Sequence, residues 1–347
     1  MPHIVHLLEA TAGGTQRHVR ELSATLDPKR FTQTLVLSPT RNPSHFGDGI
    51  APHVRVITLP MARGISPARD FFALVKLVRL LRSLSPDILH AHSSKAGALG
   101  RLAAAHLRIP CVYTPHGLSF CDTTLTPFRR ATYLRIEKFL ARFTTAFVAL
   151  SREEFYIARD TLRIPPARIW RIPNGTDTQA VDCNRTQSDA PDIAFVGRAA
   201  PQKGLDVFLR AVEILRAARP GLRVLAVTDA PDEVAAWREA CRAAVFVMPS
   251  RWEAAPYTLL DAMAHGMAIA ASRVGGVADL LRDNENALLV EPGNPAALAA
   301  ACARLLDDAP LRARLAQQAR HDARPLTPSG MAAQYEILYV RSQRPAG

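Results

Sequence analysis

The sequence predicts an α/β fold made of two tandem doubly wound domains, and three observations support this prediction. Short runs of β-branched and apolar residues alternate with stretches whose apolar residues recur at helical spacing. Such repetition forms parallel sheets that are covered by helices on both faces. The alternation stops once, over a polar stretch, and then restarts. The chain has 347 residues, 48% of them hydrophobic, which is enough for two packed cores.

The first domain, which we place at residues 1–175, begins the alternation. Its predicted strands are residues 3–8, 32–38, 54–59, 87–92, 110–115 and 145–150. Between several of them lie stretches with helical periodicity, including 71–84 and 96–107.

Residues 176–191 are polar and end in proline, which is typical of an interdomain linker. The second domain, placed at residues 192–327, then repeats the pattern. Its predicted strands are 192–196, 222–228, 243–248 and 267–272, and its predicted helices are 203–218, 232–242 and 257–265.

The last segment, residues 328–347, contains one more predicted helix. Tyr335, Leu338 and Tyr339 share one face of it. Because this face is apolar, we expect the helix to pack back on the first domain.

The net charge is +12, and all of the excess lies in the first half of the chain. Residues 1–175 hold 24 Lys and Arg against 11 Asp and Glu (+13), whereas residues 176–347 hold 19 against 20 (−1). A basic half attracts nucleic acid, an anionic bilayer or a phosphorylated substrate, and solvated arginine-rich faces explain it equally well. Since no aromatic-basic motif occurs, we do not expect nucleic acid as a partner.

The cysteines and the N-terminal residues indicate a cellular location. The cysteines lack metal-ligand spacing, and we expect five reduced thiols, at Cys111, Cys121, Cys183, Cys241 and Cys302. The first residues lack a basic leader with an apolar core, and no stretch approaches the roughly 18 apolar residues of a membrane span. We therefore expect a cytoplasmic protein, either soluble or peripheral on the inner face of the membrane.

The segment "ATAGGTQRHVREL" follows the first predicted strand. Ligands of doubly wound sheets bind beyond the carboxyl ends of strands, at helix N-termini. Gly13 and Gly14 lie at such a position, where the backbone can approach an anionic ligand closely. A plain turn explains two glycines equally well, and the stricter G-x-G-x-x-G pattern is absent.

The segment "FVGRAAPQKGLDVFL" opens the second domain with two cations near a helix start. Arg198 follows a strand end and Lys203 precedes the next helix, so both can converge on a diphosphate. Solvated loop charges are the alternative interpretation.

With these two segments, the motifs "YTPHGLSF", "IPNGTD" and "SRWEAAPYTLLDAMAHG" resemble those of retaining glycosyltransferases of family 4, which have the two-domain GT-B fold. The resemblance runs over nearly the whole chain. The motif "LHAHSSKAGALGRLAA", followed by "YTPHGLSF", resembles the branch that builds capsular polysaccharide, exopolysaccharide or O-antigen units on a lipid carrier.

The resemblance implies roles for several residues. The family motif E-x7-E corresponds to Glu253 and Asp261, which would bind the donor sugar hydroxyls and the nucleotide ribose. A carboxylate suits both roles because it accepts several hydroxyl hydrogen bonds. His116 would lie near the donor sugar and the diphosphate, and Gly275 and Gly276 would line the donor side of a cleft between the two domains.

The resemblance also implies a reaction without a metal. No D-x-D triplet occurs in the sequence, and we expect neither a metal nor a cofactor. Arg198, Lys203 and helix N-termini would stabilise the charge of the departing diphosphate, while His116 and Glu253 complete the expected catalytic set. The expected partners are a UDP- or GDP-linked sugar and a polyprenyl-diphosphate-linked acceptor.

Residues 127–143, "PFRRATYLRIEKFLARF", interleave basic with apolar residues. This pattern is compatible with a helix at an anionic membrane surface, but it slightly favours an ordinary helix that packs on the core with a solvated basic face.

Three departures from the family pattern leave other functions open. Asp261 replaces the expected glutamate, "EAAP" replaces E-G-F-G from Glu253 onward, and the segment 222–250 lacks a strand–helix–strand unit that relatives have. The alternatives are a GT-B protein that binds a ligand or partner without catalysis, and a nucleotide-sugar epimerase of the same architecture.

Overall fold

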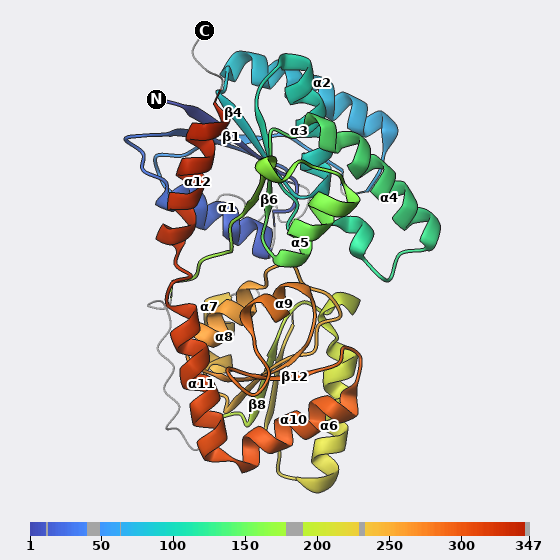
Figure 1. Cartoon of the computed structure of the whole chain (residues 1–347), viewed down its shortest axis with the longest axis vertical. Helices are drawn as coiled ribbons and strands as arrows, with labels where there is room; N and C mark the ends of the chain where they lie inside the picture. The colour runs from blue at the N-terminus through green and yellow to red at the C-terminus, as the bar shows by residue number, and fades with distance from the viewer. Residues whose placement is uncertain (12, 40–48, 63, 178–189, 229–232, 344–347) are drawn as a thin grey trace. The chain divides into compact units, whose positions relative to one another are not determined.

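The structure is a computed structural model that describes residues 1–11, 13–39, 49–62, 64–177, 190–228 and 233–343 (Figure 1). The chain forms two compact units. The first unit joins Met1–Asn174 with Pro328–Gly347, and the second unit is Gly175–Thr327. Most of the predicted linker, 176–191, lies outside the described residues.

The first unit contains a seven-stranded parallel sheet with the order β3-β2-β1-β4-β5-β6-β7. The strands are β1 (His3–Leu8), β2 (Thr32–Leu37), β3 (Arg55–Thr58), β4 (Ile88–His92), β5 (Cys111–Thr114), β6 (Ala146–Ala149) and β7 (Ile169–Arg171). All six predicted strands are confirmed, whereas β7 was not predicted. The order reverses between β1 and β4, which is the switch point of a doubly wound sheet.

Helices cover both faces of this sheet. They are α1 (Gly14–Thr25), α2 (Pro67–Leu84), α3 (Ser94–Leu107), α4 (Pro127–Leu140), α5 (Arg152–Tyr156) and α12 (Pro328–Ser342). Helices α2 and α3 enclose an apolar core on one face, while α1 and α12 lie side by side on the other (Figure 1). Tyr335, Leu338 and Tyr339 are completely buried, so the predicted return of the last helix to the first domain is confirmed.

The second unit contains a five-stranded parallel sheet with the order β12-β11-β10-β8-β9. The strands are β8 (Ile193–Val196), β9 (Val224–Val227), β10 (Val245–Met248), β11 (Ala268–Ser272) and β12 (Leu288–Val290). The first four were predicted and β12 was not. Here the switch point lies between β8 and β10.

The helices of the second unit enclose two apolar cores, one on each face of the sheet. They are α6 (Leu205–Ala218), α7 (Glu233–Ala240), α8 (Tyr257–Ala264), α9 (Gly275–Leu280), α10 (Pro295–Asp307) and α11 (Ala309–Ala323). Helices α6 and α10 cover one face, and α7 and α8 cover the other, with α11 along the border of both.

None of the helices in the described part of the chain is long and apolar enough to cross a membrane. The expectation of five reduced thiols is wrong at Cys241, which is disulfide-bonded. Cys111, Cys121 and Cys302 are free thiols, and Cys183 lies outside the described residues.

Candidate functional site

The switch point of the second unit brings two loops together at the carboxyl ends of its central strands. The loop after β8 carries Gly197 and Arg198 and then forms a 3-10 turn, Pro201–Lys203, ahead of α6. The loop after β10 carries Ser250 and Glu253. Because neighbouring parallel strands end at the same edge of a sheet, these loops lie together at the edge where doubly wound sheets typically bind ligands.

Lys203 and Glu253 meet at this edge. The Lys203 Nζ atom lies 2.6 Å from Glu253 Oε1, and the side chains are only 16% and 5% exposed. The Ser250 hydroxyl donates a hydrogen bond of 2.8 Å to the same carboxylate oxygen. Two residues that the sequence proposed separately, one for the diphosphate and one for the sugar, therefore form one ion pair.

Two glycines allow the loops to pack this closely. Gly204 has a φ of +68°, and a Cβ atom there would lie 2.1 Å from the Pro249 carbonyl oxygen. A Cβ atom on Gly276 would lie 1.8 Å from the Ala254 carbonyl oxygen, and the Gly276 N–H donates to the Glu253 carbonyl at 2.8 Å. Gly276 thus supports the loop that presents Glu253, next to Gly275 at the start of α9.

Asp261 lies on α8 and is 4% exposed. Its Oδ1 atom accepts a hydrogen bond of 2.6 Å from the Thr176 hydroxyl, which is also buried. The carboxylate is therefore held at a defined position, and its role toward a ribose stays a prediction.

Arg198 differs from Lys203 because it is exposed to solvent. The structure places it in the loop after β8, directly after Gly197. Its contact with a diphosphate also stays a prediction.

In the first unit, Gly13 and His116 lie beyond the carboxyl ends of β1 and β5. Gly13 has a φ of +67°, and a Cβ atom there would have no described atom within 4 Å, while Gly14 is the first residue of α1. His116 is partly exposed and has a φ of +54°. The next residue, Gly117, donates its N–H to Glu154 Oε1 at 2.9 Å.

Glu154, on α5, was not singled out from the sequence. Its other oxygen accepts the Leu150 N–H at 2.8 Å, so the carboxyl group joins the end of β6 to the turn after His116. Burial raises the pKa of Glu154 to about 7, although both backbone hydrogen bonds act in the opposite direction.

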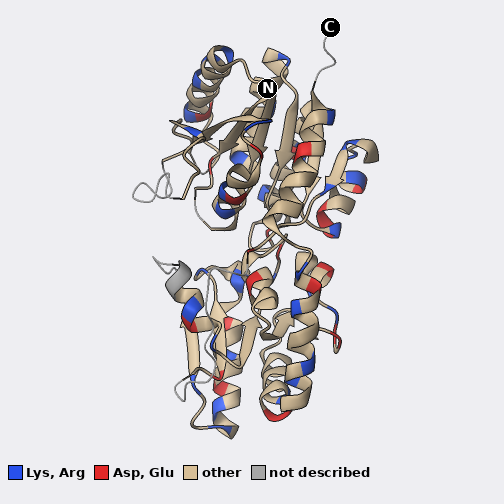
Figure 2. Ribbon diagram, turned by 90° about the vertical axis from the view of Figure 1, so that its left-hand side faces the viewer, with Lys and Arg blue, Asp and Glu red and all other residues tan. Residues whose placement is uncertain are grey.

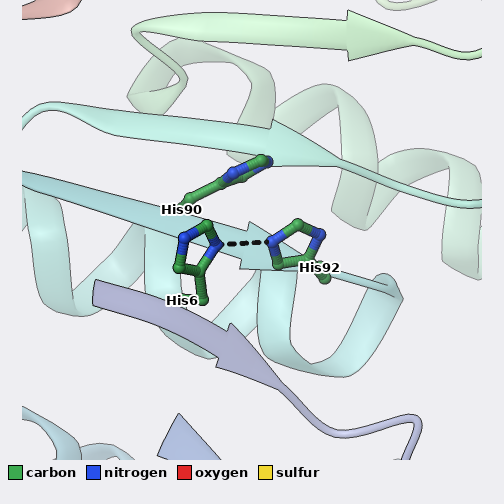
Figure 3. A group of neighbouring side chains, drawn as sticks. All are labelled: His6, His90 and His92. Carbon is green, nitrogen blue, oxygen red and sulfur yellow. Dashed lines mark hydrogen bonds between the residues drawn. The ribbon is translucent and has the colours of Figure 1, made fainter. Parts of the chain in front are cut away.

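A cluster of buried histidines lies behind His116, and sequence reasoning missed it. His6, His18, His90 and His92 are completely buried. His6 Nδ1 lies 3.2 Å from His92 Nε2, and His92 Nδ1 lies 3.1 Å from His116 Nε2. Figure 3 shows the contact between His6 on β1 and His92 on β4.

Two members of the cluster have partners of other types. His90 Nδ1 lies 2.7 Å from the Tyr339 hydroxyl, and His90 Nε2 lies 2.8 Å from the Thr114 hydroxyl. His18 Nδ1 lies 2.8 Å from Asn174 Oδ1.

Burial keeps these imidazoles neutral at pH 7. It lowers the pKa of His6 to about 3 and that of His18 to about 4. The pKa values of His90, His92 and His116 also lie well below the usual value, first because of burial and second because of neighbouring histidines. The H-x-H spacing in "LHAH" was a usable signal, since alternate residues of a strand share one face.

Two protein-family models match the chain. The model described as Glycosyltransferase Family 4 matches residues 12–180. The model described as Glycosyl transferases group 1 matches residues 229–322.

The chain is also similar to individual proteins. It is 28% identical over 293 residues to the UDP-Gal:alpha-D-GlcNAc-diphosphoundecaprenol alpha-1,3-galactosyltransferase of Escherichia coli, a match that covers 74% of this chain and 76% of that protein. Sucrose-phosphate synthase from Thermosynechococcus elongatus superposes with a TM-score of 0.81 and 22% identity over 98% of both chains. Anabaena Alr3699/HepE in complex with UDP gives a TM-score of 0.77 and 19% identity over 98% of this chain and 100% of that chain. The two structural likenesses concern the fold.

Proposed function

Since the chain belongs to glycosyltransferase family 4 and has the GT-B fold, we propose that it moves a hexose, with retention, from a UDP-linked donor to a polyprenyl-diphosphate-linked acceptor. The family models and the Escherichia coli galactosyltransferase support glycosyl transfer in the synthesis of a lipid-linked glycan. The alternatives, a binding protein without catalysis and an epimerase, are not favoured by these comparisons.

The ion pair between Lys203 and Glu253 is the observation that carries this proposal. The Lys203 ammonium and the Glu253 carboxylate lie 2.6 Å apart at the switch point of the second unit. A nucleotide-sugar has a diphosphate and sugar hydroxyls next to each other, so one ligand can satisfy both groups. On donor binding, Lys203 would turn to the diphosphate and Glu253 to the hydroxyls.

The same residues account for catalysis. Negative charge grows on the diphosphate as the anomeric bond breaks, so a fixed cation interacts more strongly with the transition state than with the intact donor. We assign this role to Lys203 and Arg198. Asp261 would bind the ribose, and the neutral His116 ring would hydrogen-bond to the sugar. Gly13, Gly14, Gly275 and Gly276 would let the backbone approach the donor.

The Lys203→Ala variant tests this assignment. We expect turnover with a UDP-sugar and a lipid-linked acceptor to fall by about 100-fold or more, because one preorganised charge contributes this much to a transition state. Turnover is measured by mass spectrometry of the glycosylated lipid. Arg210→Ala, which removes an exposed cation from α6, is the matched control and should retain full activity. Wild-type turnover in the Lys203 variant would exclude the assignment.

A membrane-bound acceptor also requires contact with a lipid surface, and we propose α4 as the element that makes it. Phe128 and Phe139 are 78% and 47% exposed. The basic residues of this region are all exposed, namely Arg129, Arg130, Arg135, Lys138 and Arg142. The one acid of residues 127–143, Glu137, is buried and paired with Arg101 at 2.8 Å. The exposed residues of α4 therefore include basic and aromatic side chains but no acid. Figure 2 marks the basic and acidic residues along the ribbon.

Co-sedimentation with vesicles tests the membrane contact. We expect binding to vesicles that contain anionic lipid, little binding to neutral vesicles, and a loss of binding in an Arg129→Glu, Lys138→Glu double variant. Equal binding to both vesicle types would contradict the proposal without affecting the proposed glycosyl transfer.

A further inference from the structure

We propose that His18, His92 and His116 form a binding site for a divalent transition-metal ion of the zinc class. One nitrogen from each ring lies within 4.8 Å of the others. The three residues come from α1, from the end of β4 and from the turn after β5, so the site lies at the ligand-binding edge of the first unit. The proposal goes beyond the proposed glycosyl transfer, for which no metal is expected.

His18 is already oriented as a metal ligand. The Asn174 Oδ1 atom can only accept a hydrogen bond, so the His18 Nδ1 atom 2.8 Å away carries the proton. The lone pair is then on Nε2, which is buried and has no hydrogen-bond partner among the described residues. A ligating histidine typically has this arrangement, with an oxygen acceptor that fixes the tautomer and the ring orientation.

His92 and His116 supply the other two nitrogens. With Nε2–H of His92 donating to His6 Nδ1, the lone pair of His92 lies on Nδ1 and faces His116 Nε2 at 3.1 Å. Two nitrogens bound to one tetrahedral zinc ion at about 2.0–2.1 Å lie about 3.3 Å apart. A metal ion can therefore replace the proton between these two rings with a small movement.

A second histidine group, His6, His90 and His92, also has nitrogens within 4.8 Å of one another (Figure 3). Both nitrogens of His90 are engaged by the Tyr339 and Thr114 hydroxyls, and all three rings are completely buried. Metal binding there would break one of the two hydrogen bonds of His90, and an ion would have to cross the packed core. His116 is partly exposed, so the site that includes it can exchange an ion with solvent.

The donor set determines the class of ion. Neutral imidazoles bind Zn²⁺, Co²⁺, Ni²⁺ and Cu²⁺, whereas Mg²⁺ and Ca²⁺ prefer oxygen ligands. Three protein ligands leave a fourth position for water or an oxygen of a ligand. A bound ion would occupy His116 Nε2, so excess Zn²⁺ should inhibit the transfer. This last consequence rests on the proposed function, whereas the metal binding does not.

Metal titration of the full chain tests the proposal. We expect wild-type protein, freed of metal by chelator dialysis, to bind one Zn²⁺ per chain by calorimetry. With Co²⁺ it should show the intense visible absorption of a tetrahedral site. The His18→Gln variant should bind at least about 10-fold more weakly, as is usual when a ligand or its orienting partner is removed.

The His90→Gln variant is the matched control, because it changes a buried histidine of the same cluster outside the proposed ligands. It should bind Zn²⁺ as wild type does. Failure of the wild-type protein to bind one ion would overturn the proposal even if the His18 variant does not fold. An affinity that falls in the His90 variant as much as in the His18 variant would also overturn it.

Discussion

The two units share the doubly wound architecture, but different kinds of residue lie at the carboxyl ends of their strands. In the second unit, a charged pair in the loops, Lys203 and Glu253, lies above cores that are almost entirely apolar. In the first unit, the polar groups continue into the interior, where histidines of β1, β4 and α1 contact one another. A doubly wound sheet can therefore position a site either by loop packing or by a buried polar network.

This difference predicts that the stability of the first unit depends on pH. The pKa of His18 is lowered to about 4 and that of His6 to about 3, from 6.5 in the unfolded chain. Above pH 6.5 the rings are neutral in both states and the folded state has its full stability. As the pH falls from 6.5 towards 4, only the unfolded chain binds protons at these rings, so the folded state loses stability. Each ring accounts for about 1.4 kcal/mol per pH unit, so the two together lose about 4 kcal/mol by pH 5. His90, His92 and His116 act in the same direction, whereas Glu154, whose pKa is raised to about 7, acts in the opposite direction over this range.

Unit-specific tryptophan fluorescence measures this loss in metal-free buffer. A variant with Trp237→Phe and Trp252→Phe keeps only Trp170, which lies on β7 of the first unit. Its urea midpoint should decrease when the pH is lowered from 6.5 to 5. A Trp170→Phe variant, which reports on the second unit, should show a smaller decrease. If the urea midpoint depends on pH in the same way for both reporters, the two units do not differ in this property.

The second unit should instead be sensitive to backbone crowding. In Gly276→Ala the new Cβ atom would lie 1.8 Å from the Ala254 carbonyl oxygen, so the Glu253 loop must move. We expect a loss of roughly 3 kcal/mol in the free energy of unfolding, the upper range for overpacking, together with a loss of activity. Urea denaturation measures the change in the free energy of unfolding. Gly221→Ala, where no described atom lies within 4 Å of the new Cβ atom, should be neutral. Equal stability of the two variants would show that the loop does not depend on this contact.

The smallest effect is expected at Asp261. Thr176→Val keeps the side-chain shape but removes the hydroxyl that donates to Asp261 at 2.6 Å. We expect a loss of about 1 kcal/mol in stability and a higher KM for the donor with kcat nearly unchanged. Thr258→Val on the same helix is the control, because the Thr258 hydroxyl is buried without a partner among the described residues. An unchanged KM in the Thr176 variant would weaken the assignment of Asp261 to the ribose.

The elements of the fold that could be predicted are those with a clear local sequence pattern. Strands such as β6 and β10 are continuous apolar runs, and all ten predicted strands were recovered, six in the first unit and four in the second. The two that were missed, β7 and β12, are three residues each, which is too short for a recognisable period.

The candidate site was predictable only where a motif marks it. Glu253, Lys203 and His116 stand in recognisable segments, but the sequence does not show that Lys203 pairs with Glu253, because the two loops meet only through the order of β8 and β10. The histidine cluster depends in the same way on the pairing of His6 with His90, residues that are far apart in the chain. Contacts of this kind follow from sheet register rather than from spacing.

Helix α12 has a consequence for how the protein is made. During synthesis, residues 1–174 leave the ribosome well before the segment that begins at Pro328. Until that segment arrives, Tyr335 and Tyr339 cannot cover the sheet, and His90 lacks its phenol partner. One face of the N-terminal sheet therefore stays partly uncovered while the second unit is translated. We expect chaperones to bind this uncovered sheet face during that interval.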